Sequence, residues 1–171
     1  MSIFKPDVYN EDLFFYPYIQ AAPVGDLLSS LKVTRNNTQK FFEGITVEKA
    51  NYTYASKKWS VKQVLHHITD IERILSYRFL RLNRGDATEL LAFDRELLVE
   101  NEQKTISVEA LLEEFLAVRN ASIQLIKTAN ISLLDFKAPY KNLEFSPRIL
   151  GWMIAGHNQH HLNLLKEKYD L

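Results

Sequence analysis

Five histidines are the residues of this chain best suited to bind a metal or to transfer a proton, and they occupy only two short segments. His66 and His67 are adjacent, and His157, His160 and His161 lie close together near the C-terminus. The chain contains no cysteine, which excludes disulfides, cysteine zinc sites and a thiol nucleophile supplied by the protein. Any metal must therefore be bound by histidine, aspartate or glutamate.

The first histidine pair lies within a predicted helix over residues 60–83. Ser60 and Gln63 have the spacing of a capping box, in which each side chain accepts a hydrogen bond from the other residue's backbone N–H. At about 100° per residue, the apolar residues of this helix form one face. His67 lies at the edge of that face and His66 projects nearly opposite. His67 is therefore expected to point into the protein.

The other three histidines lie within a predicted helix over residues 146–169, which begins with a serine–proline pair typical of a helix N-terminus. His157 and His161 fall near the centre of its apolar face, and His160 lies nearer the margin. Because His157 and His161 are four residues apart, successive turns can direct both imidazoles at one point. With His67 from a facing helix, they would supply three neutral nitrogen ligands to a divalent transition metal. The alternative is that these histidines pack in the core without a metal.

Several other side chains near the two segments are candidates for the site. Glu72 falls on the apolar face of its helix, where it would orient a bound histidine or act as a base, or else pair with an arginine or lysine at the end of the bundle. Trp59 and Trp152 precede the two clusters and either wall a pocket or pack in the core. Asp94 either reaches the site or remains in a solvated loop. The aromatic run at 14–18 is either a lid or a partner surface, or, as the simpler explanation, part of an N-terminal segment packed over the bundle.

Apolar stripes of helical period predict four helices of similar length, and their expected ranges are 25–44, 60–83, 107–130 and 146–169. Such helices bury one another best as an all-α four-helix bundle. The segment 86–105 is too long for a tight turn, so it either crosses the bundle or contains a short helix at 95–102. Gly151 and Gly156 reduce helix propensity and therefore indicate close packing against a neighbouring element.

Length and composition predict a single soluble domain over residues 1–171, with residues 1–23 as an N-terminal extension packed on the bundle. The chain has 21 Lys+Arg and 21 Asp+Glu, and this balance argues against nucleic acid and anionic lipid as partners. No stretch of about 18 uninterrupted apolar residues is present, and the N-terminus lacks signal-peptide character. We expect a cytoplasmic protein without a membrane segment.

The two histidine segments also match a known sequence pattern. Residues 59–73, WSVKQVLHHITDIER, resemble the W-S-x-x-E-x-x-x-H-x-x-D-x-E-R segment of the DinB-like superfamily. Residues 155–162, AGHNQHHL, resemble its A-G-H-x-x-H-H-L ending, and 77–86, 93–94 and 107–119 follow the pattern in order. The resemblance covers the chain from about Tyr18 onward. It implies a four-helix bundle with one long crossover connection.

The resemblance also implies a function. Family members are often dimeric and hold nickel or zinc through one histidine of the second helix and an HxxxH pair of the last, here His67, His157 and His161. His66 and His160 are then neighbours of the site. Members include YfiT-like proteins described as metal-dependent hydrolases, and thiol transferases that use bacillithiol or mycothiol. The chain departs from the pattern at His66 and at residues 95–98.

These observations predict a metal-dependent enzyme that activates a low-molecular-weight thiol or water at a three-histidine site, acts on a small molecule and forms a homodimer. Thiol transfer needs little besides the metal, whereas hydrolysis requires a base for which Glu72 is a weak candidate, so thiol transfer ranks first. Because the chain has no cysteine, the sulfur must arrive with the substrate. The alternative is a non-catalytic metal-binding or dimerisation module of a stress response.

Overall fold

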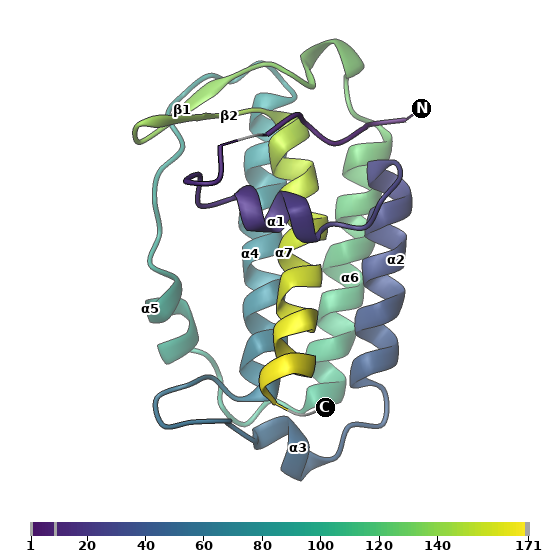
Figure 1. Cartoon of the computed structure of the whole chain (residues 1–171), viewed down its shortest axis with the longest axis vertical. Coiled ribbons are helices and arrows are strands. Elements are labelled where there is room, and N and C mark those ends of the chain that lie inside the picture. Colours follow the sequence, from purple (N-terminus) through teal and green to yellow (C-terminus); the bar gives the residue numbers. More distant parts are fainter. Residues whose placement is uncertain (1, 9, 170–171) are drawn as a thin grey trace.

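Four long helices form a bundle in the computed structural model, which describes residues 2–8 and 10–169 (Figure 1). They are α2 (Leu27–Phe42), α4 (Val61–Leu82), α6 (Val108–Lys127) and α7 (Pro147–Lys168). The shorter elements are α1 (Tyr16–Ala21), α3 (Val47–Asn51), α5 (Arg95–Glu100), the 3-10 turn η1 (Ile131–Leu133), β1 (Ala138–Tyr140) and β2 (Leu143–Phe145). The predicted four-helix bundle is confirmed. The antiparallel β1–β2 hairpin lies where the sequence predicted only a loop.

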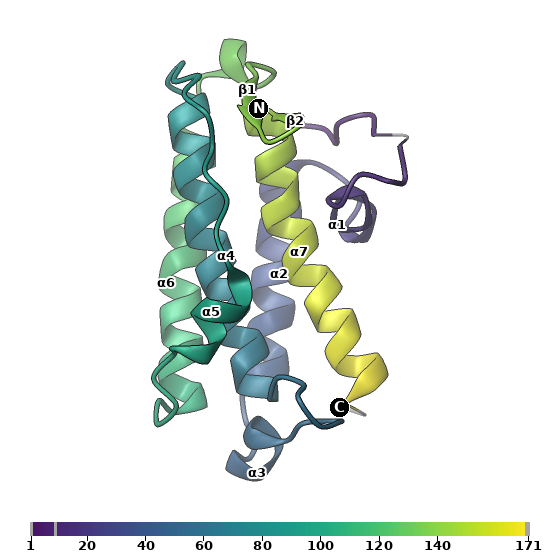
Figure 2. The ribbon, with the colours of Figure 1, turned by 90° about the vertical axis from the view of Figure 1, so that its left-hand side faces the viewer.

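The chain crosses the bundle once between its second and third long helices. In Figure 1, α2 and α7 run in one direction and α4 and α6 in the other, and α4 packs against both α6 and α7. Because the neighbours α4 and α6 are parallel, residues 83–107 must return the chain to the end where α4 began. This crossover contains α5, which lies beside α4 (Figure 2). The segment therefore both crosses the bundle and contains a short helix, which the sequence had offered as alternatives.

The long helices begin at the residues that the sequence marks as caps. Asp26 accepts hydrogen bonds from the first-turn N–H groups of α2, and Ser107 and Ser146 do the same for α6 and α7. Ser60 and Gln63 form the predicted capping box of α4, with the Ser60 N–H donating to Gln63 Oε1 at 2.8 Å. These local bonds fix where α4 and α7 begin, and hence the place of each histidine along its helix.

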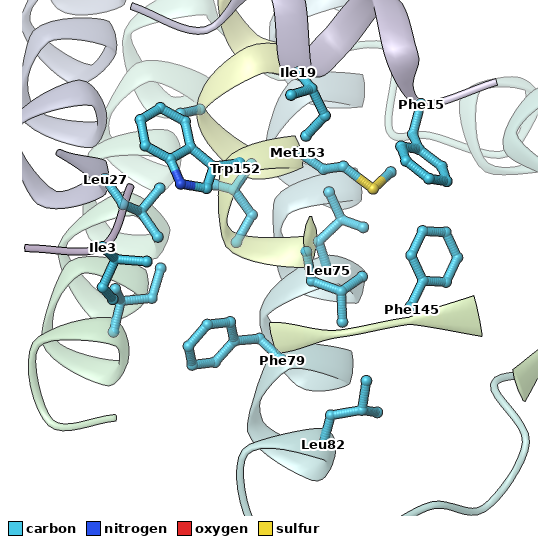
Figure 3. Close-up of a cluster of buried hydrophobic side chains, with 14 of the residues drawn as sticks. Ile3, Phe15, Ile19, Leu27, Leu75, Phe79, Leu82, Phe145, Trp152 and Met153 are labelled. Atoms are coloured by element: carbon cyan, nitrogen blue, oxygen red, sulfur yellow. The ribbon is translucent and has the colours of Figure 1, made fainter. Parts of the chain in front are cut away.

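The N-terminal segment packs on α7 and completes a large part of the core (Figure 3). Ile3 and Ile19 lie in the same buried cluster as Trp152 and Met153, and the indole Nε1 of Trp152 donates a hydrogen bond to the backbone oxygen of Phe4 at 2.9 Å. Helix α1 contacts α7 along one side of the bundle (Figure 2). Through α1, Tyr18 lies next to the histidines of α7.

Gly156 permits this close approach of α1. A Cβ atom at Gly156 would clash with the backbone oxygen of Tyr18, whereas a Cβ at Gly151 would meet Leu27 Cδ2 at 2.6 Å. A backbone oxygen can move only if α1 moves, but the end of a leucine side chain can rotate. The predicted close packing at both glycines is therefore confirmed, and Gly156 is the more restrictive of the two.

We expect Gly156→Ala to lower the free energy of unfolding. Alanine favours a helix by about 1 kcal/mol over glycine, but displacing α1 costs about 1–3 kcal/mol more, as overpacking does in cores. Gly151→Ala is the matched control, and its free energy of unfolding should fall by less than that of Gly156→Ala. Urea denaturation of both variants measures the difference, and a Gly156→Ala protein as stable as Gly151→Ala would contradict the close approach.

A buried polar network connects all four long helices. Arg119 on α6 donates from Nε and Nη2 to the two carboxylate oxygens of Glu72 on α4, both at 2.7 Å. Its Nη1 donates to Thr34 Oγ1 on α2 at 2.6 Å, and its Nη2 also donates to Asn158 Oδ1 on α7 at 3.1 Å. The Arg119 and Glu72 side chains are 0% and 2% exposed. Buried charges of this kind require every partner in place.

We expect Arg119→Met to lower the free energy of unfolding by about 3–5 kcal/mol, because it leaves the Glu72 carboxylate buried without its cation. The double variant Glu72→Leu with Arg119→Met removes both charges and should recover much of that loss. Chemical denaturation at neutral pH provides the measurement. A double variant no more stable than Arg119→Met alone would argue against a buried ion pair as the source of the effect.

Candidate metal centre

Three histidine side chains from two helices meet inside the bundle. The Nε2 atoms of His67 on α4 and His157 on α7 lie 3.1 Å apart, and the Nε2 of His161 lies 3.1 Å from that of His157. One ring nitrogen of each histidine lies within 4.8 Å of the other two. The structure therefore brings together the three histidines that the helical spacing selected.

Aromatic rings on either side restrict the orientation of these imidazoles. The ring of Trp59, just before α4, lies 4.6 Å from that of His67, centroid to centroid. The ring of Tyr18 on α1 lies edge-on to His157 at 5.2 Å and to His160 at 5.3 Å. Residues before α4 and on α1 thus hold the imidazoles from outside the two helices that carry them.

The surroundings keep the three imidazoles uncharged. Burial, and to a smaller extent the positive charge of Arg95, lowers the pKa of His67 to about 4. Burial also lowers the pKa of His157 and His161 well below the usual range, and the neighbouring histidines and Arg95 add to this effect. At neutral pH each ring is therefore a neutral imidazole, the form that coordinates metals.

The donor set fits a divalent transition metal. Zinc binds histidine nitrogen at about 2.0–2.1 Å, which places two ligands of a tetrahedral site roughly 3.3 Å apart. Two of the three Nε2 separations are 3.1 Å. The Nδ1 of His161 is buried and has no hydrogen-bond partner among the described residues. A proton on that nitrogen leaves the Nε2 lone pair directed at the other two histidines. Three neutral nitrogen ligands leave at least one coordination position for a reactant.

Two cavities meet at the three histidines. The larger, here called the basic cavity, has a volume of about 310 Å³, and its lining includes Tyr18, Tyr54, Lys57, Lys58, Trp59, His67, Arg95, Glu96, His160 and His161. The smaller, here called the apolar cavity, has a volume of about 210 Å³, and its lining includes Phe14, Tyr18, His67, Ile71, Leu75, Arg78, Phe93, Arg95, Met153 and His157.

The cavities differ in charge and share one boundary. Lys57, Lys58 and Arg95 give the basic cavity three cations against the single carboxylate of Glu96. His67 lines both cavities, whereas His161 lines only the basic one and His157 only the apolar one. Two molecules, one in each cavity, would therefore meet at the histidine cluster.

The other predicted site residues lie in different surroundings. Trp59 and His160 line the basic cavity. His66 faces away from the cluster, and its Nδ1 lies 3.0 Å from Glu102 Oε2. Trp152 is buried beneath the N-terminal segment and lines neither cavity. Asp94 caps α5, where its Oδ1 accepts hydrogen bonds from the N–H groups of the next turn.

Glu72 does not occupy the position of a base. Both of its carboxylate oxygens accept hydrogen bonds from Arg119, and it lines neither cavity. The sequence raised an ion pair as the alternative for Glu72 but placed it at the end of the bundle. The pair instead lies in the interior, because Arg119 comes from the adjacent helix α6.

Sequence reasoning missed several residues that line the cavities, among them Tyr18, Arg78 and Arg95. Tyr18 comes from a short helix without a long apolar stripe. Arg78 falls on the predicted second helix, in the segment 77–86 that follows the family pattern, but the pattern does not single it out. Arg95 had one signal, since the segment 95–98 departs from the family pattern. Tyr18 and Arg95 line both cavities and so lie at their junction.

Comparison with known proteins identifies the family of this chain. The family model of the DinB superfamily matches residues 30–165. This chain belongs to the DinB superfamily. The superfamily assignment made from the two histidine motifs is thereby confirmed. No curated protein matches the chain.

Among solved structures, this DinB-superfamily chain is similar to YfiT from Bacillus subtilis, with a TM-score of 0.74 and 16% sequence identity. The match covers 98% of this chain and 92% of the other. YfiT is described as a probable metal-dependent hydrolase with an unusual four-helix bundle topology. At this level of identity the likeness concerns the fold.

The buried neutral histidines make the stability of the metal-free protein depend on pH. The pKa of His67 is about 4 in the folded state, against 6.5 for an ordinary exposed histidine, so the unfolded chain binds more protons between these values. His67 therefore destabilises the folded state as pH falls below 6.5, by about 2 kcal/mol near pH 5.

We expect His67→Gln to lose less stability than wild type between about pH 7.5 and pH 5, measured by urea denaturation with a chelator present. Equal losses in the two proteins would show that His67 is not buried in its neutral form.

Proposed function

We propose that this DinB-superfamily protein is a metal-dependent enzyme that uses His67, His157 and His161 to hold a divalent transition metal, either nickel or zinc. The reaction proposed is attack by a low-molecular-weight thiol on a small electrophilic molecule. The convergence of three neutral imidazole nitrogens between two cavities of different chemical character is the observation that carries the proposal.

A divalent metal, when bound, lowers the pKa of a coordinated thiol or water so that its anion is available near neutral pH. The three histidines would hold this metal. Trp59 packs against the ring of His67 and Tyr18 against that of His157, so these contacts keep the imidazoles in position. Lys57, Lys58 and Arg95 supply positive charge to the basic cavity, which suits a polar thiol that carries negative groups. The apolar cavity suits the electrophile, because its walls are mainly aromatic and aliphatic.

The two-cavity arrangement favours thiol transfer over hydrolysis. Transfer brings two organic molecules together, and each would have its own cavity at the shared boundary formed by His67. Hydrolysis requires a base close to the reacting water. Among the described residues that line the cavities, Glu96 is the single carboxylate; its side chain is 63% exposed and pairs with Arg95 at 3.3 Å. Glu72 is already bound to Arg119.

Hydrolysis is the second candidate, and the description of YfiT as a probable metal-dependent hydrolase favours it. In that case water would replace the thiol, and Glu96 would be the carboxylate available from the basic cavity. A non-catalytic metal-binding or dimerisation module of a stress response is the third. Metal content and turnover together distinguish these possibilities.

We also propose a homodimer, a cytoplasmic location and a small-molecule substrate. No helix in residues 2–8 and 10–169 has both the length and the apolar character needed to cross a bilayer. The homodimer is inferred from the family resemblance alone, and the molar mass in solution tests it. A cytoplasmic location and a single domain over residues 1–171 also remain proposals.

Protein purified without a nickel column should contain, or take up, about one equivalent of zinc or nickel by elemental analysis, because three neutral imidazoles form a nearly complete zinc site. We expect His161→Ala to weaken metal binding by more than about 100-fold, beyond the effect of losing an outer-shell partner. His66→Ala is the matched control and should keep the metal. Less than about 0.1 equivalent in wild type after metal is offered would defeat the proposal, because such a site binds strongly when folded.

The metal-loaded protein should accelerate conjugation of one or more biological thiols to a chromogenic aryl halide. His157→Ala should abolish the acceleration, and His66→Ala should retain it, because only the former removes a proposed ligand. The absorbance of the aryl thioether, which forms as the halide leaves, measures the rate with each thiol. Equal rates in wild type and His157→Ala would indicate that the metal site is not catalytic toward thiols.

A further inference from the structure

Arg78 is a buried cation in the wall of the apolar cavity. Arg78 lies on α4 and is 6% exposed. Its neighbours in the cavity wall include Met153 and His157. Its guanidinium lies over the rings of Phe93 and Tyr140, at 5.3 Å and 4.9 Å from their centroids. One Nη2 hydrogen bond goes to the backbone oxygen of Leu91. An arginine remains protonated in proteins, so the cavity wall carries a positive charge.

Arg78 and Arg119 are both buried arginines, but their partners differ. Arg119 binds both oxygens of Glu72. Within residues 2–8 and 10–169, no carboxylate lies within 4.0 Å of Arg78 as an ion-pair partner. Two aromatic rings and a carbonyl offset part of the cost of burying the charge, but they leave it without an anion. A buried guanidinium that faces a cavity without a bound carboxylate is suited to receive one from a ligand.

The cavity limits which anion can bind. Its volume of about 210 Å³ lies below the ~300 Å³ at which pockets for drug-sized ligands begin. A small molecule with one apolar group therefore fits. A carboxylate carries a single negative charge, equal in magnitude and opposite in sign to that of Arg78, and its two oxygens match the guanidinium fork. Arg95 also lines the cavity, but its side chain is 62% exposed and pairs with Glu96.

From this arrangement we propose that Arg78 binds the carboxylate of the electrophilic substrate, with the apolar body of the substrate in the apolar cavity beside His157. The substrate class is thus a small apolar carboxylic acid. The proposal rests on the proposed function for the identity of the reacting partner, but the binding of a carboxylate by Arg78 needs no metal. Arg78 is a specificity-determining residue, since it would select the substrate.

Binding of two isosteric probes tests this directly. 3-Phenylpropanoate and 3-phenylpropanamide have the same shape and differ in charge. Isothermal titration of metal-free wild-type protein should show that the acid binds at least about tenfold more tightly than the amide. The reason is that a hydrogen bond between charged groups is stronger than one to a neutral group. Arg78→Met should abolish the preference, and Arg78→Lys should reduce it because lysine lacks the fork. Arg73 lies on the same helix and pairs with Asp70 and Glu114 at the surface. The control variant Arg73→Met should therefore keep the preference for the acid.

The outcomes separate this proposal from the metal site. Equal binding of acid and amide to wild type would overturn the role of Arg78 even if both arginine variants failed to fold. A preference for the acid that exists only after zinc is added, and is absent in His161→Ala, would place the carboxylate on the metal and also overturn it. A preference that persists in His161→Ala supports Arg78, because His161 does not line the apolar cavity. Tighter binding of phenylphosphonate than of the acid would overturn the carboxylate class.

Discussion

Arg119 forms hydrogen bonds to each of the other three long helices, and the site depends on the relative positions of the helices that these bonds set. Its partners are Glu72 on α4, Thr34 and the backbone oxygen of Leu31 on α2, and Asn158 on α7. A shift of one helix by a single turn moves its residues about 5.4 Å and would leave a buried charge or polar group without its partner. Asn158 directly follows His157, so the network fixes the level of α7 against α4 where the histidines meet.

The same arrangement determines the chemistry that the protein can perform. Burial keeps the pKa of the three histidines low, so they present lone pairs rather than protons to the space between the helices. Helix α1 and the crossover, which are not part of the four-helix core, complete the surroundings through Tyr18 and Arg95. The bundle therefore supplies the proposed metal ligands and part of the cavity walls, and α1 and the crossover complete those walls.

Much of the bundle was predictable because its signals are local. Ser60 with Gln63, and Ser146, mark helix starts by bonds within one turn, and the spacing of His157 and His161 places both on one face. Contacts between distant segments left no such signal. The partner of Glu72 lies 47 residues away on α6, Tyr18 approaches Gly156 from a six-residue helix, and β1 and β2 pair in a stretch without strong strand alternation. Sequence therefore selected the three histidines but not the cavities around them.

The central claim is that three imidazoles bind one metal. X-ray absorption at the zinc edge of the zinc-loaded protein measures the ligands directly. The geometry predicts three histidine nitrogens at about 2.0–2.1 Å, with the remaining position occupied by oxygen from solvent. His161→Ala should lose one imidazole from that shell, whereas His66→Ala should keep all three. A shell composed of oxygen with no more than one imidazole would contradict the claim.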